Sequence, residues 1–365
     1  MSVIFDNHCH CFPPLGHPGE ADAARLAEHQ YHVRFHGQGV TRKRDNVRIS
    51  EHILAGEKDG ISWQPDVNFR IGKFGKLEYT KDDEEYYTQW MPPTLPDMSS
   101  SADYIVAQMD YVGVDRAVLQ HDRIYGKLDD FLGDCVRRYP TRFVAAAQVD
   151  EWVGGRADQL DRLKRQVGEL GFRSVYFSTG GFFHTDFSLE VNDPSLEPLW
   201  TLVKDLGITV HWYAAKLRQP SVPDYLGELR QFIKWAEAHP DIPSVLTHGL
   251  NNIHYDKDKP NRFSVPDELF QLLSFPNWHM ELMLHLMAGD IEFPPYEPGL
   301  KKVVRELVDV VGAESLVWGS DMPACERTVT YKQSLILFQT QCDFLTDDQR
   351  ALIMGGNLAR LYPLA

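Results

Sequence analysis

Residues 101–121 read SADYIVAQMDYVGVDRAVLQH and contain one unit that recurs to the end of the chain. The first part of this stretch places Ile105, Met109 and Val112 on one face of a predicted helix. Gly113 can end that helix because glycine readily adopts the left-handed conformation. The apolar run RAVLQH that follows predicts a buried strand. A helix that leads directly into a strand indicates an α/β fold.

The same alternation extends outward in both directions. Strands are predicted at 3–10, 116–121, 143–150, 174–179, 208–214, 244–248, 278–284 and 315–321. Helices are predicted at 101–113, 127–139, 156–170, 194–206, 223–238, 266–273, 300–311 and 330–342, and a final helix at 347–361 carries a capping box from Thr346 to Gln349. Strands that alternate with helices imply right-handed crossovers and a parallel sheet. Eight such units favour a closed (β/α)₈ TIM barrel over an open doubly wound sheet.

Residues 11–100 interrupt this pattern between the first strand and its helix. The stretch is rich in Gly, Pro, His and charged residues, with β-like pieces at 68–71 and 76–80. Because long loops without structure are uncommon in compact domains, we expect an inserted subdomain with a small sheet inside one domain that spans 1–365. The insertion leaves the carboxyl end of strand 1, where barrels place their functional sites, and is therefore expected to form a lid or a binding wall.

Composition excludes several classes of function. The chain of 365 residues has 37 Lys and Arg against 52 Asp and Glu, a net charge of −15, which argues against nucleic-acid and membrane-surface partners. Its five cysteines are scattered without a C-x-x-C pair, and no signal peptide or membrane-length apolar run is evident, so a cytoplasmic protein is expected. Neither glycine-rich nucleotide motif occurs, and no organic cofactor is expected.

Histidines mark the first strand. Asp6, His8 and His10 are expected on one face of it because strand side chains alternate, whereas Cys9 should point the other way. Two imidazoles two residues apart can chelate one divalent ion, but an H-x-H pair in a chain of this length also arises by chance. The pair alone therefore leaves a metal site and a polar strand end open as alternatives.

Three more polar residues lie at the same predicted rim. His211 lies in the fifth strand, His248 ends the sixth and Asp321 ends the eighth. A single histidine in a strand is more often a satisfied core residue, but burying so many polar groups together is costly unless something binds them. One divalent metal ion explains the set, and nitrogen ligands with one carboxylate favour Zn²⁺, with Mn²⁺, Fe²⁺ or Co²⁺ as alternatives.

With these residues in place, the chain resembles the amidohydrolase superfamily, in the amidohydrolase-related branch that contains aminocarboxymuconate semialdehyde decarboxylase. The matching pieces are DNHCH (6–10), ITVHW (208–212), LTHG (246–249), WGSDMP (318–323) and MGGNLARLY (354–362). The resemblance implies that His8, His10, His211 and Asp321 are metal ligands and that His248 is a general acid/base. The fourth strand, SVYFST, lacks the lysine that binuclear relatives carbamylate, which favours one metal ion.

The reaction is left open between two outcomes. A metal-bound water of lowered pKa, with His248 and Asp321 as the acid–base pair, could serve non-oxidative decarboxylation of a small unsaturated or aromatic carboxylic acid. The same groups could hydrolyse a lactone, an amide or another small cyclic substrate. Decarboxylation is the leading hypothesis, hydrolysis is the alternative, and a non-catalytic metal-binding barrel is the third.

Substrate contacts are predicted from weaker signals. In the decarboxylase branch a comparable insertion brings an arginine to the substrate carboxylate, and Arg70 lies in a similar context, although it could equally be a solvated strand residue. Trp90 could stack on a flat ring, Tyr213 follows His211 on the same face, and Arg327 could bind an anion. Relatives are commonly dimers, so a homodimer acting on a small carboxylate or cyclic substrate is expected. Glu281 and His285 share a face of the seventh strand, whose register the sequence leaves uncertain.

Overall fold

The structure is a computed structural model that describes residues 2–15, 23–35, 39–49, 53–54, 64–215, 222–250, 265–287 and 298–364. Its centre is an eight-stranded parallel sheet in which the strands follow one another in chain order. The strands are β1 (Phe5–Cys9), β7 (Arg116–Leu119), β8 (Phe143–Gln148), β9 (Ser174–Ser178), β10 (Thr209–Tyr213), β11 (Ser244–Thr247), β12 (Trp278–Leu282) and β13 (Leu316–Trp318). All eight predicted strands are therefore present.

The sheet curls so that its last strand meets its first. Just after β13, the Asp321 N–H donates to the His8 carbonyl at 2.9 Å, and the His10 N–H donates to the Met322 carbonyl at 2.7 Å. These bonds join the two edge strands at their carboxyl ends. The predicted TIM-barrel fold is thus confirmed, and the junction lies beside the histidines of β1.

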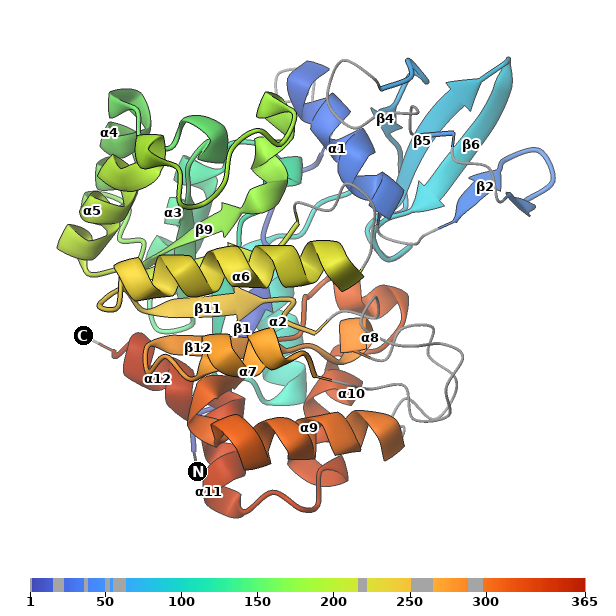
Figure 1. The fold of residues 1–365 in the computed structure, drawn as a ribbon. Coiled ribbons are helices and arrows are strands. Elements are labelled where there is room, and N and C mark those ends of the chain that lie inside the picture. Colours follow the sequence, from blue (N-terminus) through green and yellow to red (C-terminus); the bar gives the residue numbers. More distant parts are fainter. Residues whose placement is uncertain are drawn as a thin grey trace.

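Helices surround the barrel (Figure 1). They are α2 (Ala102–Val112), α3 (Asp129–Arg138), α4 (Ala157–Gly168), α5 (Glu197–Leu206), α6 (Val222–Ala238), α7 (Asp267–Leu273), α8 (Leu284–Met287), α9 (Pro298–Val311), α10 (Tyr331–Ile336), α11 (Asp347–Ala351) and α12 (Asn357–Leu361). Ser101 caps α2 by accepting from the Tyr104 N–H, and Gly113 ends it with φ 85°, as the sequence predicts. None of the helices in the described ranges is long and apolar enough to span a bilayer.

The final helix differs from its prediction as one element over 347–361. The capping box of Thr346 and Gln349 is present, but a π-helical turn at Leu352–Gly356 separates α11 from α12. A side chain at Gly355 would place its Cβ 2.3 Å from the Val3 carbonyl oxygen. The chain therefore bends where the backbone packs directly against the start of β1.

The barrel has an apolar floor and a polar mouth. Phe5, Val118, Val144, Val245, Val317, Leu358 and Tyr362 form one buried cluster near the amino ends of the strands. Outside the barrel wall, Trp200, Trp212 and Trp235 are fully buried and pack on one another. These layers hold the strands in place, so that the polar side chains at their carboxyl ends have defined positions.

The insertion forms its own small sheet beside the mouth (Figure 1). Its antiparallel strands are β3 (Arg48–Ile49), β2 (Val40–Arg42), β6 (Glu84–Gln89), β5 (Lys76–Lys81) and β4 (Arg70–Ile71), in that spatial order. The two β-like pieces predicted from the sequence correspond to β4 and β5. Helix α1 (Ala23–Phe35), by contrast, has no counterpart in the sequence-based prediction because charged residues and histidines interrupt its apolar periodicity.

A buried group of charges joins α1 to the barrel. The Arg123 guanidinium pairs with the carboxylates of Glu28 and Glu151, and His184 Nε2 lies 2.9 Å from Glu28 Oε2. All four side chains are about nine-tenths buried or more. Burial raises the pKa of Glu28, but Arg123 and His184 outweigh that effect and lower it to about 2. Removing one partner of such a pair leaves an uncompensated buried charge, so the group fixes the insertion against the mouth.

Candidate metal centre

The end of β1 carries a local irregularity that aims its histidines. Asp6 pairs with Ala117 but Cys9 pairs with Leu119, so β1 holds one residue more than its partner between these points. As a result Asp6 does not share the face of His8, contrary to the strict alternation expected from the sequence. The Asp6 carboxylate instead accepts hydrogen bonds from the Ser320 hydroxyl, the Tyr331 hydroxyl and the Cys9 thiol.

His8, His10 and Asp321 converge at the junction between β1 and β13. The Nε2 atoms of the two histidines are 3.0 Å apart. Asp321 Oδ1 lies 3.0 Å from His10 Nε2 and 3.8 Å from His8 Nε2. All three residues are buried, and their potential ligand atoms lie within 4.8 Å of one another.

The opposite ring nitrogens show which atoms carry lone pairs. His8 Nδ1 lies 3.0 Å from Glu281 Oε2, and His10 Nδ1 lies 3.2 Å from the carbonyl oxygen of Gln120. Both partners are acceptors, so each Nδ1 carries the hydrogen and each Nε2 presents a lone pair. Burial, followed by the neighbouring His10, lowers the pKa of His8 to about 3, which keeps this ring neutral.

Two nitrogen lone pairs and a carboxylate oxygen therefore face one another at about hydrogen-bond distance. Without a cation among them this arrangement is repulsive and leaves buried polar atoms unsatisfied. A divalent ion satisfies all three at once. In metal sites of proteins, a histidine ligand usually donates its other ring N–H to a carboxylate or a carbonyl, which orients the ring. These residues consequently fit the metal ion that the sequence predicts.

Three further residues surround this triad. His248 follows β11 with φ 54°, and its N–H donates to Glu281 Oε2 at 3.0 Å. The centroids of the His248 and His8 rings are 4.7 Å apart, and burial, then His8, lowers the pKa of His248 to about 3. His285, at the start of α8, places Nε2 3.0 Å from Asp321 Oδ2.

Asp321 remains ionised despite its burial. Desolvation would raise the pKa of Asp321, but the neighbouring imidazoles of His10 and His285 outweigh that effect and hold the pKa well below its usual range. Burial raises the pKa of the Glu281 carboxyl. The sequence left the register of β12 uncertain, and the structure now shows that Glu281 points into the barrel and contacts His8.

His211, the fourth predicted ligand, is fully buried and contacts Gln120 and Tyr362 in the structure. Its Nδ1 lies 2.6 Å from Gln120 Nε2, an amide nitrogen that also donates to the Asn7 carbonyl, and its Nε2 lies 2.7 Å from the Tyr362 hydroxyl. Both ring nitrogens of His211 thus have a polar contact. The same Gln120 meets His211 with its side-chain amide and His10 with its backbone carbonyl.

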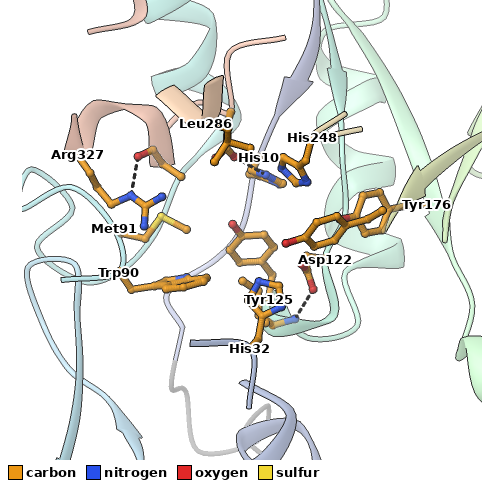
Figure 2. A pocket seen from close by; sticks show the side chains of 14 residues that line it. His10, His32, Trp90, Met91, Asp122, Tyr125, Tyr176, His248, Leu286 and Arg327 are labelled. Atoms are coloured by element: carbon orange, nitrogen blue, oxygen red, sulfur yellow. Dashed lines mark hydrogen bonds and ion pairs between the residues drawn. The ribbon is translucent and has the colours of Figure 1, made fainter. Parts of the chain in front are cut away.

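A pocket opens directly in front of the triad (Figure 2). The empty space between its walls is about 480 Å³, open solvent at the mouth included. The lining residues are His10, His32, Trp90, Met91, Asp122, Ile124, Tyr125, Tyr176, Tyr213, His248, Leu286, Asp321, Ala324 and Arg327. His32, Trp90 and Met91 come from the insertion, which therefore supplies one wall.

The predicted substrate contacts divide into two groups. Trp90, Tyr213 and Arg327 line the pocket. Arg70 does not, because it lies on β4 and its guanidinium pairs with Glu85 and, at 3.6 Å, with Glu78. The sequence gives no sign of this because the two glutamates belong to neighbouring strands of a sheet whose register it does not determine.

Arg327 lines the pocket and forms no ion pair with any carboxylate among the described residues. Its Nε donates to the Ala324 carbonyl at 2.9 Å, and its guanidinium lies 5.7 Å from the centroid of the Trp90 ring. Nη1 is buried and has no hydrogen-bond partner. Burial lowers the pKa of Arg327 from its ordinary value, which nevertheless leaves a cation at neutral pH.

Comparisons with known proteins agree with this architecture. Among solved structures, an amidohydrolase from Burkholderia multivorans with bound zinc is 16% identical, with a TM-score of 0.56, and the match covers 74% of this chain and 90% of that chain. A probable 2-pyrone-4,6-dicarboxylic acid hydrolase from Acinetobacter baumannii with bound citric acid is 17% identical, with a TM-score of 0.54 over 74% and 91% of the two chains.

A dihydroxybenzoic acid decarboxylase from Polaromonas with bound manganese and an inhibitor is 14% identical, with a TM-score of 0.51 over 72% and 86% of the two chains. At these identities the similarity establishes the fold. No curated protein matches the sequence significantly. The sequence model of the amidohydrolase family, however, matches residues 6–364, which is nearly the whole chain. The chain therefore belongs to the amidohydrolase family of metal-dependent enzymes.

Proposed function

We propose that this protein is a non-oxidative decarboxylase of a small unsaturated or aromatic carboxylic acid, dependent on one divalent metal ion. The ion would be held by His8, His10 and Asp321, whose ligand atoms converge as described above. Zn²⁺ fits this donor set, as do Mn²⁺ and Fe²⁺. When bound, the ion would supply a Lewis acid that polarises an oxygen of the substrate.

The observation that carries the substrate class is the buried guanidinium of Arg327, which forms no ion pair among the described residues. A buried cation without a carboxylate partner is costly, and the planar fork of arginine matches a carboxylate in a bidentate contact. Arg327 lies beside Trp90 at the wall of the pocket that also opens on the triad. A flat carboxylic acid would satisfy this guanidinium and pack on the aromatic side chains around it.

The side chains of this chain would also handle the proton. A ring carbon that loses its carboxyl group as CO₂ must gain one proton in exchange. We assign this proton transfer to Asp321, within the triad, and to His248, beside it. Both side chains line the pocket. The insertion contributes Trp90, Met91 and His32 to the wall, which would exclude water from this exchange.

Hydrolysis of a lactone or an amide is the second candidate, and the neutral state of His248 favours it. A neutral imidazole beside the triad can accept a proton from a water molecule, as ring opening requires. A carboxylate on the cyclic substrate would use Arg327 in the same way. The two candidates share the pocket and differ in the bond that breaks.

The product separates the two reactions. Protein loaded with Zn²⁺ or Mn²⁺ would be incubated with 2,6-dihydroxybenzoate and, separately, with 2-pyrone-4,6-dicarboxylate. Release of CO₂ from the first supports decarboxylation, and proton release with loss of the pyrone absorbance supports hydrolysis. The matched control is His248→Ala, which should retain the metal and lose turnover. Metal-loaded protein that turns over neither compound nor other ring acids and lactones of similar size would contradict both.

A further inference from the structure

A second charged side chain, the carboxylate of Asp122, lines the pocket and is opposite in sign to Arg327. Asp122 follows β7 and begins the 3-10 helix Arg123–Tyr125, and its Oδ1 accepts the Ile124 N–H at a long 3.3 Å. Among the described residues, no ion pair joins Asp122 to any side chain. The carboxylate is half-buried and lines the pocket, so it keeps acceptor capacity that the described residues do not use.

Aromatic side chains surround this carboxylate. In Figure 2 Asp122 lies beside Tyr176 and His32, whereas Arg327 lies on the other side of the pocket with Trp90 and Met91, and Tyr125 stands between them. Burial, with the charge of Asp122 adding to it, raises the pKa of Tyr176 and of Tyr213 well above the usual range. These phenols stay protonated and supply aromatic faces rather than counter-charges.

A half-buried carboxylate at one side and a buried guanidinium at the other make the pocket dipolar. Neither charge has an ion-pair partner among the described residues, and a ligand of complementary polarity would supply one to each. Both charges line the pocket, and no ion pair joins them to each other. A ligand that spans the pocket can contact both.

We propose that the substrate of this pocket is a dipolar ring acid that binds its carboxylate at Arg327 and a hydroxyl or amino donor at Asp122. Asp122 is then a specificity-determining residue. This inference deepens the proposed function and rests on it for the carboxylate end. Aromatic walls at Tyr125 and Trp90 suit the flat ring between the two polar groups, and the faces of Tyr176 and Tyr213 also favour a cationic donor.

Binding of three matched probes to the metal-loaded protein tests the proposal. They are methylbenzoate with a neutral methyl group on the ring, hydroxybenzoate and (aminomethyl)benzoate, each as the 3- and the 4-substituted acid, measured by isothermal titration calorimetry. A charge-assisted hydrogen bond to Asp122 should make at least one hydroxy or aminomethyl isomer bind about tenfold more tightly than the methyl compound of the same pattern. Equal affinities in the wild-type protein would overturn the proposal without any variant.

Asp122→Asn keeps the cap on the Ile124 N–H and removes the charge. It should lower the preference for the donor-bearing probes to about twofold or less, whereas Arg327→Gln should weaken all three probes by a similar factor. An unchanged preference in Asp122→Asn would contradict the role of this residue. Unaltered binding in Arg327→Gln would instead contradict the carboxylate contact of the proposed function, and so the two failures are distinguishable. Metal content and thermal unfolding of each variant serve as controls for folding.

Discussion

Replacing Glu281 tests whether a residue that orients a metal ligand affects metal binding while all ligands stay in place. It is fully buried on β12 and lies 3.0 Å from His8 Nδ1, while its oxygens accept from the Asn7 side chain at 2.7 Å and from the His248 N–H at 3.0 Å. Glu281→Gln keeps the shape of the side chain but loses one acceptor oxygen. His8 Nδ1, the His248 N–H and the Asn7 amide would then compete for one acceptor oxygen, which weakens the contact that fixes the tautomer of His8.

The expected consequence is weaker metal binding in a folded protein. Loss of a carboxylate behind a histidine ligand typically costs about 10- to 100-fold in metal affinity, which corresponds to about 1.4–2.7 kcal/mol. The assay is competition for Zn²⁺ with a chelator of known affinity, followed by elemental analysis. Glu228→Gln is the matched control, because Glu228 is also a buried glutamate but contacts Thr179, away from the triad. Equal metal affinity in wild-type protein and Glu281→Gln would refute the reasoning.

Three further predictions follow from the same contacts. His8→Ala should lose both metal and activity whereas His248→Ala should keep most of the metal and lose activity, and full metal content in His8→Ala would disprove its place in the triad. Arg123→Met leaves Glu28 and Glu151 buried without their cation and should cost about 3–5 kcal/mol in urea unfolding, so a loss below about 1 kcal/mol would argue against the buried charge group. Burial lowers the pKa of His121 to about 3, below its unfolded value of 6.5, so the unfolded state binds more protons between these values and stability is lost as pH falls through this window. His121→Leu should flatten that dependence by at most about 1.4 kcal/mol per pH unit in unfolding measured from pH 4 to 7, and an unchanged slope would contradict it.

The barrel could be predicted from the sequence because each of its units carries its own local signals. Ser101 and Gly113 delimit α2 by capping chemistry, and the strands are short apolar runs between such boundaries. Eight repetitions leave few alternative topologies. Polar residues at strand ends, such as His10 and Asp321, then gather at one rim as a direct consequence of parallel strands.

The arrangement within the rim could not be predicted in the same way. The extra residue in β1 turns Asp6 out of the barrel, and strict alternation gives no warning of such a bulge. The contacts of His211 with Gln120 and Tyr362 are equally unpredictable from the sequence, and its predicted role as a ligand stays a prediction. Both outcomes depend on contacts between residues that are far apart in the chain.

The wall of the pocket shows the same limit. The sequence predicts Trp90, Tyr213 and Arg327 as contacts, and all three line the pocket. Asp122 and His32 also line it, but the sequence does not predict them. His32 belongs to α1, which carries no clear periodicity, and Asp122 reads as an ordinary helix cap. Arg70 shows the converse, because a residue in a suggestive context pairs instead with Glu78 and Glu85 across a sheet.

The central claim is that one divalent ion binds at the junction of β1 and β13. Anomalous diffraction from crystals of the zinc-loaded protein, collected on both sides of the zinc absorption edge, locates the ion directly. The account predicts a single peak within about 2.0–2.2 Å of His8 Nε2, His10 Nε2 and an oxygen of Asp321. A peak bound by other residues, or an ion that leaves either histidine out of its coordination, would contradict it.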